Sequence, residues 1–355
     1  MTSFFELLPN ELLDNIISFL ATEPPSREKF HLPPSLELTQ SPTKNLKHLA
    51  QSSSRFLELV RPQLFTHACL DLHDEPKFHS FLDRSGLGRY VTSLVVVGDD
   101  SADHPADPLW WRRILRYLDP ACITVLAPPT FIGKTLGTPI MDGHSWAFGI
   151  SLQILQLERD GHSHDLSALP DLESHTSLLS TRHWTSLSFN EASSLKAYNH
   201  YEYFLSHVPS VIGEWGNLVS SQSPPPADLP LLLDRLTAFS YTAVFPFYSH
   251  AHIVLAVVSI MRNLKQFNVQ LAPDANNHAT EAEQRGSLDP NDPWMELETA
   301  YSLIGFHINP MGVLREFCSR DFHLEAIRPE LCRIMNEDLG HSGWVHDGRG
   351  VWRRG

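Results

Sequence analysis

The sequence predicts an α/β chain in which a small N-terminal bundle of three helices precedes a solenoid of alternating short parallel strands and helices. Two patterns predict this organisation. Apolar residues near the N-terminus recur at the spacing of one helical face, and strand-like runs in the rest of the chain recur about every thirty residues. The 355 residues, 42% of them hydrophobic, suffice for one small and one larger domain. We therefore expect a helical module over residues 1–66, with an insert over 21–44, and a body over 67–355.

The first predicted helix covers roughly residues 9–20, within the segment LPNELLDNIISFL. Pro9 stands in the first turn, where a proline loses no hydrogen bond, and Glu11 favours the positive end of the helix dipole. The apolar residues that recur along one face of this helix are Leu8, Leu12, Leu13, Ile16, Ile17 and Leu20.

Two further short helices are predicted in the segment LKHLAQSSSRFLELVRPQLF. Ser53 or Ser54 can cap the third helix, and we expect Pro62 to end it. The apolar stripe of the second helix consists of Leu46, Leu49 and Ala50, and that of the third of Phe56, Leu57 and Val60. Three short helices with these stripes have more apolar surface than they can bury among themselves.

This series of elements resembles the F-box. The F-box pattern opens with L-P-x-E-[LI]-[LI] and an isoleucine one turn later, continues with L-x-x-L-[AR]-x-[VS]-[CS]-[KR]-x-[FW], and ends near P-x-L-[FWY]. The resemblance covers residues 5–66. The matching residues are Leu8, Pro9, Glu11, Leu12, Leu13, Ile16, Leu46, Leu49, Ala50, Ser52, Phe56, Pro62, Leu64 and Phe65.

The resemblance implies a non-catalytic substrate-recognition adaptor of a Skp–cullin–F-box ubiquitin ligase. Its partners would be a Skp-type adaptor, through it a cullin–RING ligase, and a protein substrate that the sequence does not identify. The residues that the resemblance places at the adaptor interface, or directly beneath it, are Leu8, Pro9, Leu12, Ile16, Leu46, Leu49 and Phe56. Helices that merely pack on the body, without an adaptor, are the alternative.

The insert over residues 21–44 is rich in proline and serine, where the F-box usually has only a few residues. Because closing a loop costs only about 0.6 kcal/mol more per doubling of its length, the insert need not unfold the bundle. We expect it to have no core of its own, and an insert of this length can cover or displace the adaptor surface.

In the body, strand-like runs share the spacing φ-x-x-φ-x-φ, where φ is apolar, and the second and third apolar residues are expected to point inward from a short strand. The runs are Val91-Leu94-Val96, Leu152-Leu155-Leu157, Trp184-Leu187-Phe189, Leu236-Phe239-Tyr241 and Leu264-Phe267-Val269, with a poorer copy around Leu126. Helices are predicted between them, over residues 77–83, 108–118, 195–207 and 249–262.

These repeats resemble the irregular leucine-rich-repeat solenoid of many F-box proteins, and a compact α/β domain with crossover helices fits the same period. The C-terminal segment GWVHDGRGVWRR is similar to the end of uncharacterised fungal F-box proteins and suggests no chemistry. As functional alternatives to the adaptor we keep a stand-alone repeat scaffold, whose N-terminal helices only cap the solenoid, and a serine hydrolase.

Composition limits the partners. A net charge of −14 repels phosphate backbones and anionic lipid, so we expect neither nucleic acid nor membrane as a partner. The N-terminus lacks the features of a signal peptide, and the four cysteines form no C-x-x-C motif. We therefore expect a soluble protein of the cytoplasm, the nucleus or both, with reduced and mostly buried thiols.

Catalytic and metal-binding patterns are weak. Ser145, in the sequence GHSWA, is the candidate nucleophile of the hydrolase alternative, but no hydrophobic strand precedes it as a nucleophile elbow requires. Gly133-Lys134-Thr135 ends like a phosphate-binding loop but has Pro128 where that loop needs glycine. The histidine pairs at 162 and 164 and at 250 and 252 lack further ligands. We expect no catalytic residue, cofactor or metal.

Overall fold

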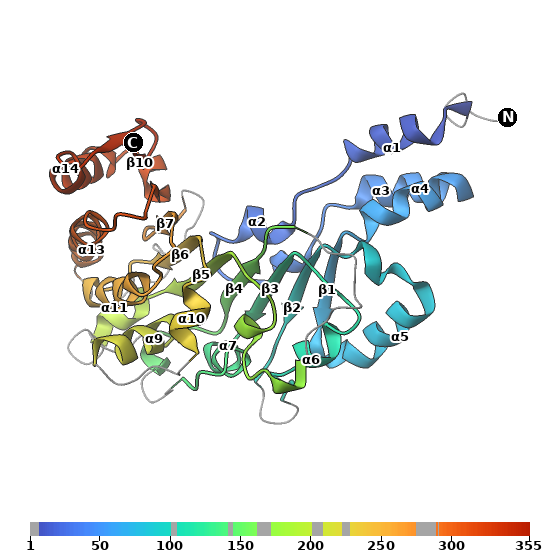
Figure 1. The fold of residues 1–355 in the computed structure, drawn as a ribbon, viewed down its shortest axis with the longest axis horizontal. Coiled ribbons are helices and arrows are strands. Elements are labelled where there is room, and N and C mark those ends of the chain that lie inside the picture. The colour runs from blue at the N-terminus through green and yellow to red at the C-terminus, as the bar shows by residue number, and fades with distance from the viewer. Residues whose placement is uncertain are drawn as a thin grey trace.

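The computed structural model describes residues 7–100, 105–140, 145–161, 172–200, 209–221, 228–274, 289 and 291–355. The chain is an α/β protein built on one ten-stranded, mostly parallel sheet (Figure 1). Within these ranges no helix combines the length and the apolar character needed to cross a membrane.

The strands follow one another across the sheet almost in chain order, β1-β2-β3-β4-β5-β6-β7-β8-β10-β9. Neighbours are parallel except around β4, which is antiparallel to β3 and β5, and around β10, which is antiparallel to β8 and β9. The strands are β1 (His67–Asp71), β2 (Ser93–Val97), β3 (Cys122–Ala127), β4 (Gln153–Glu158), β5 (Ser186–Ser193), β6 (Ala238–Val244), β7 (Gln266–Gln270), β8 (Glu316–Ser319), β9 (Trp344–His346) and β10 (Val351–Arg354).

Helices follow most strands and line the outer side of the curved sheet, while α2 lies on the opposite side (Figure 1). The α-helices are α1 (Asn10–Ser18), α2 (Pro25–Lys29), α3 (Lys44–Ser52), α4 (Ser54–Leu64), α5 (Glu75–Ser85), α6 (Trp111–Ile114), α7 (Pro129–Thr135), α9 (Val211–Ser220), α10 (Leu229–Leu233), α11 (Tyr248–Ser259), α13 (Asp292–Ile308) and α14 (Arg328–Leu339). Helices α1, α3 and α4 stand at the β1 end of the sheet.

The inward side chains of the sheet align from strand to strand. Strand pairing places Leu187 beside Phe239, Phe239 beside Phe267, and Phe267 beside Phe317, and Trp352 of β10 continues the row. The rings of Phe239 and Phe267 stack with centroids 5.7 Å apart. This row lies in one apolar core that runs from Leu70 to Trp352, and it confirms the inward positions predicted for these strands.

Two details of the predicted strands are wrong. Strand β4 runs antiparallel to its neighbours, because α7 and the segment after it return the chain to the end of β3, so that Gln153 pairs with Ala127. Leu126 is buried on the face away from the helices, whereas Ile123 and Val125 point into the main core. A shift of one residue moves a strand side chain to the other face, and the poorer copy was aligned one residue out of phase.

The helix predictions in the body fit unevenly. Helices α5 and α11 form where residues 77–83 and 249–262 predict them. Residues 108–118 contain only the short α6, because the rest of that segment consists of turns. The 195–207 helix is a 3-10 helix (Leu195–His200) as far as the described residues extend. The C-terminal segment forms the β9–β10 hairpin, which ends the sheet.

The insert forms structure and packs on the sheet, contrary to the expectation that it lacks a core. Helix α2 and a 3-10 helix (Leu36–Thr39) place Phe30 and Leu38 against Leu126 and Ile154. We call this side of the sheet the insert face. Strands β3 and β4 carry apolar residues on both faces, so the second face also needs a cover, and the insert supplies it.

Candidate functional site

The N-terminal helices pack into a small cluster around α4. Its buried apolar side chains are Leu13, Ile17, Leu46, Phe56 and Val60. Ser53 caps α4, because its hydroxyl accepts a hydrogen bond from the Phe56 N–H at 3.3 Å. Pro62 does not end this helix: it removes its own backbone bond, yet Phe65 N still donates to Arg61 O at 3.2 Å.

One side of α1 leaves large apolar side chains in solvent. Leu12 is 50% exposed, Ile16 38% and Phe19, directly after the helix, 86%. Their spacing of four and three residues places them on one face, which we call the exposed stripe. Arg55 of α4 ties the start of α1, because its guanidinium donates to Leu8 O at 2.6 Å and to Asn10 Oδ1. The stripe is therefore presented by a helix that is fixed on its other side.

The structure divides the seven predicted adaptor residues into two groups. Pro9, Leu12 and Ile16 are exposed and Leu8 and Leu49 are half-buried, whereas the two buried ones are Leu46 and Phe56. The buried pair can act only by supporting the helices. Phe19 was not among the predicted residues, although its position one turn after Ile16 was a usable signal.

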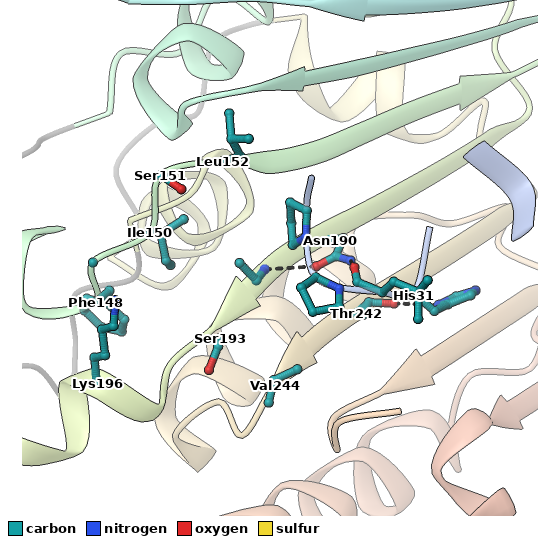
Figure 2. A pocket seen from close by; sticks show the side chains of 15 residues that line it. His31, Phe148, Ile150, Ser151, Leu152, Asn190, Ser193, Lys196, Thr242 and Val244 are labelled. Carbon is teal, nitrogen blue, oxygen red and sulfur yellow. Dashed lines mark hydrogen bonds between the residues drawn. The ribbon is translucent and has the colours of Figure 1, made fainter. Parts of the chain in front are cut away.

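A pocket of about 220 Å³ opens on the insert face, and we call it the insert pocket (Figure 2). Insert residues 31–34 form one wall, the loop over residues 148–152 another, and the carboxyl ends of β5 and β6 the floor. The His31 ring is hydrogen-bonded to Thr242 Oγ1 at 2.9 Å. Burial, together with the nearby Arg320 charge, lowers the pKa of His31 to about 3, so this ring is neutral at physiological pH.

Two carboxyl groups are buried in the sheet domain, Glu191 of β5 and Asp321 just after β8. Tyr241 donates its hydroxyl hydrogen bond to Glu191, and burial raises the pKa of Glu191 to about 7. Asp321 accepts from Tyr301 at 2.6 Å and from two backbone N–H groups, and burial raises its pKa to about 6. Both carboxyls link neighbouring strands and helices, and neither lines the insert pocket.

The described residues give no support to the two catalytic patterns in the sequence. The backbone of Ser145 begins a 3-10 helix, but its side chain, Gly143 and His144 lie outside what the structure describes. Gly133 lies within α7, and Lys134 pairs with Asp100 at 2.8 Å, so this segment does not form a phosphate-binding loop.

The metal candidates are also scattered. Within the described residues there is no group of three potential ligands, and residues 162 and 164 fall outside them. His250 is buried against the rings of Phe148 and Phe247, whereas His252 is exposed. The cysteines are free thiols, but only Cys122 is fully buried, and the expectation of mostly buried thiols is wrong because Cys69 lies on the edge strand β1.

Comparison with known proteins gives no relative: no family model, no curated protein and no solved structure matches this chain. A functional assignment must therefore rest on the residue pattern and on the geometry of these surfaces.

Proposed function

We propose that this protein is an F-box-type substrate receptor of a cullin–RING ubiquitin ligase. In this proposal the N-terminal module binds a Skp-type adaptor, and the body, a leucine-rich-repeat-like solenoid, holds a protein target. The observation that carries the proposal is the exposed stripe, Leu12, Ile16 and Phe19, within a segment that resembles the F-box. The chain acts by raising the local concentration of its target near the ubiquitin-charged enzyme, without catalysis of its own.

The exposed stripe has the chemistry of a helix that docks on an apolar partner. Large apolar side chains gathered on one face and open to water are costly unless a partner covers them. Recognition of amphipathic helices uses such anchors at i, i+4 and i+7. Leu13 and Ile17, on the other side of the same helix, are 0% and 2% exposed, so the stripe is not needed to hold α1 in place.

The position of the insert is compatible with adaptor binding. Instead of folding over α1, it crosses to the sheet, where Arg27 pairs with Glu158 at 3.3 Å and Phe30 is buried. The exposed stripe is therefore left uncovered by the insert. The exposed stripe and the insert follow each other closely in the chain, yet the stripe faces solvent and the insert packs on the sheet.

The order of the strands supports the solenoid part of the proposal. Each strand from β1 to β8 lies beside its predecessor in the chain, as in stacked repeats, and these pairs are parallel except for the two that β4 makes. Most connections pass through a helix on the outer side. The β9–β10 hairpin acts as the C-terminal cap.

A Skp-type adaptor and a cullin–RING ligase as partners would place the protein in the cytoplasm or nucleus.

Exchanging Leu12 and Ile16 together for Asp tests the proposal. We expect binding to a purified Skp-type adaptor to weaken at least about 100-fold, because two charges would enter a desolvated apolar contact. The thermal unfolding temperature should change little, since both residues are exposed. The exchange of Asn15 and Ser18 for Asp adds the same charge to other exposed positions of α1 and should leave binding intact.

Three outcomes count against the proposal. Normal adaptor binding by the Leu12→Asp, Ile16→Asp protein removes the stripe from the interface. Absence of adaptor binding by the unmodified protein favours a stand-alone scaffold. Unfolding of the N-terminal helices in the double mutant, but not in the Asn15→Asp, Ser18→Asp control, assigns the stripe to an internal contact.

A further inference from the structure

The insert pocket is formed by segments that are far apart in the chain. His31 and Pro34 come from the insert, Ile150 from the loop before β4, and Ser193 and Val244 from the ends of β5 and β6 (Figure 2). The pocket exists only because the insert is seated on the sheet. Its volume, about 220 Å³, fits one or two amino-acid side chains rather than a large cofactor.

The polar groups on the floor of the pocket are engaged in holding the insert. Asn190 is buried, and its amide donates to the carbonyls of Phe30 at 2.6 Å and Leu32 at 3.0 Å. Its Oδ1 accepts from Ala192 N at 3.0 Å. Ala192 has a φ of 71° at the β5 bulge, a conformation that costs an ordinary residue about 1 kcal/mol or more. These hydrogen bonds occupy the amide group of Asn190 on the floor of the pocket. A polar group that binds a ligand must therefore come from the rim.

Lys196 supplies this polar group. It is the one lining residue, among those that the structure describes, that carries a charge at neutral pH, because the ring of His31 is kept neutral. The residue is exposed, and its ammonium has no ion-pair or hydrogen-bond partner within the described residues. The protein as a whole has a charge of −14, so an unpaired cation beside a pocket is a local exception.

Gly149 sets the position of this lysine. It has a φ of +56°, and a Cβ built there would stand 3.0 Å from both Cδ and Nζ of Lys196. The side chain thus lies against the loop at the pocket rim, and Figure 2 shows it beside Phe148. A side chain at position 149 would push the ammonium away from the pocket.

We propose that the insert pocket binds a carboxylate-bearing peptide segment, in which Lys196 holds the carboxylate and the apolar lining takes an adjacent apolar side chain. The apolar lining consists of Leu32, Pro33, Pro34, Phe148, Ile150 and Val244. One lysine balances the single charge of a carboxylate, whereas phosphate recognition typically uses several donors or an arginine cluster.

The insert bounds the pocket on the side of the sheet, because Asn190 donates to the Phe30 and Leu32 carbonyls and His31 is hydrogen-bonded to Thr242. A peptide fits the pocket better than a free small acid because the apolar lining extends along two walls, with Pro33 and Pro34 on one and Phe148 and Ile150 on the other, and takes a side chain beside the carboxylate. The identification of such a peptide as part of a ubiquitination target rests on the proposed function.

The test uses fluorescent hexapeptide libraries with the full-length protein. One library carries a central Leu-Glu pair, a second Leu-Gln, and a third Leu-phosphoserine, with all other positions mixed. We expect the Leu-Glu library to bind at least about tenfold more tightly than Leu-Gln, the difference expected for a charge-assisted contact. Lys196→Met should remove this preference and Lys196→Arg should keep it. Lys265→Met, an exposed lysine at the far end of β7, is the matched control.

Several results would overturn the inference: no binding of any library, equal binding of Leu-Glu and Leu-Gln, or a preference that survives in Lys196→Met. Tighter binding of the phosphoserine library would replace the carboxylate by a phosphate. Binding of N-acetyl-leucyl-glutamate as tight as that of the hexapeptides would replace the peptide by a small acid. Adaptor binding of each variant is measured in parallel, so that peptide binding without adaptor binding leaves the pocket standing and removes the ligase role.

Discussion

The N-terminal helices and the sheet domain bury their apolar side chains in different ways. In the sheet domain one continuous core extends from Leu70 to Trp352, with aligned aromatic rings on successive strands. In the helical module the separate cluster centres on Ile17, Leu46 and Val60, while the exposed stripe remains in water. In the sheet domain neighbouring strands and the helices packed on them cover one another, whereas the three short helices leave part of their apolar surface in water. The exposed stripe is this uncovered apolar surface, and it lies on the helical module.

The insert belongs to the N-terminal segment in the chain but packs on the sheet domain. It leaves the module at the end of α1, supplies Phe30 and Leu38 to a third small cluster on the sheet, and returns to α3. Deleting residues 1–66 would therefore uncover Leu126 and Ile154 as well as remove the helices. The two regions are separate in their cores but share this cover.

The largest expected effect comes from breaking the aromatic row. Phe239→Ala should lower the free energy of unfolding of the sheet domain by about 4 kcal/mol, because a fully buried ring is lost and a cavity remains. Urea unfolding followed by tryptophan fluorescence measures this. Phe19→Ala, at a site 86% exposed, is the matched change and should stay within about 0.5 kcal/mol. Equal losses for the two variants would show that the core is not organised around this row.

A pH-dependent effect should come from Glu191. Burial raises its pKa from 4.5 to about 7, so the contribution of this carboxyl to the stability of the folded state is fully present below pH 4.5 and is lost as the pH rises through 7. The Glu191→Gln side chain can still accept the hydrogen bond from Tyr241 but cannot ionise, so it removes this pH-dependent loss of stability. We expect the stability of Glu191→Gln relative to the unmodified protein to rise by about 3 kcal/mol between pH 4.5 and 8. Urea unfolding at a series of pH values checks this, and a constant difference would contradict it.

A smaller effect tests the cover on the insert face. Leu38 is 2% exposed, and Leu38→Ala should cost about 2 kcal/mol, near the low end for buried leucine because its cluster is small. Leu36 is 59% exposed, and Leu36→Ala should change little. Limited proteolysis should cut the insert faster in the first variant only. Identical proteolysis of both variants would mean that the insert is not held by this contact.

The smallest effect concerns the cap of α4. Ser53→Ala should lower the stability of the module by about 1 kcal/mol, because the Phe56 N–H loses its partner. Hydrogen exchange of the α4 amides should accelerate while that of the sheet strands stays unchanged. Ser54→Ala removes a hydroxyl one residue later, inside the helix, and should have little effect. Faster exchange throughout the sheet would show that the module and the sheet unfold together.

The sequence by itself determined the features that depend on local periodicity. The helical character of α1 and the inward positions of Leu187, Phe239 and Phe267 follow from the repeat lengths of helix and strand. The capping of α4 by one of two serines followed from the preference of helix ends for hydroxyl side chains. These signals are carried by residues within a few positions of one another, so they can be read without a fold.

Only the tertiary structure decided the features that depend on distant neighbours. Leu12 and Leu13 are adjacent and chemically identical, and the packing of α1 against α4 leaves Leu12 half in water and buries Leu13. The direction of β4 depends on the end of the sheet to which the chain returns. The insert pocket needs Pro33, Ile150 and Lys196, which have no common sequence pattern. Burial and cavity shape are properties of packed surfaces, and the surfaces that meet here come from segments far apart in the chain.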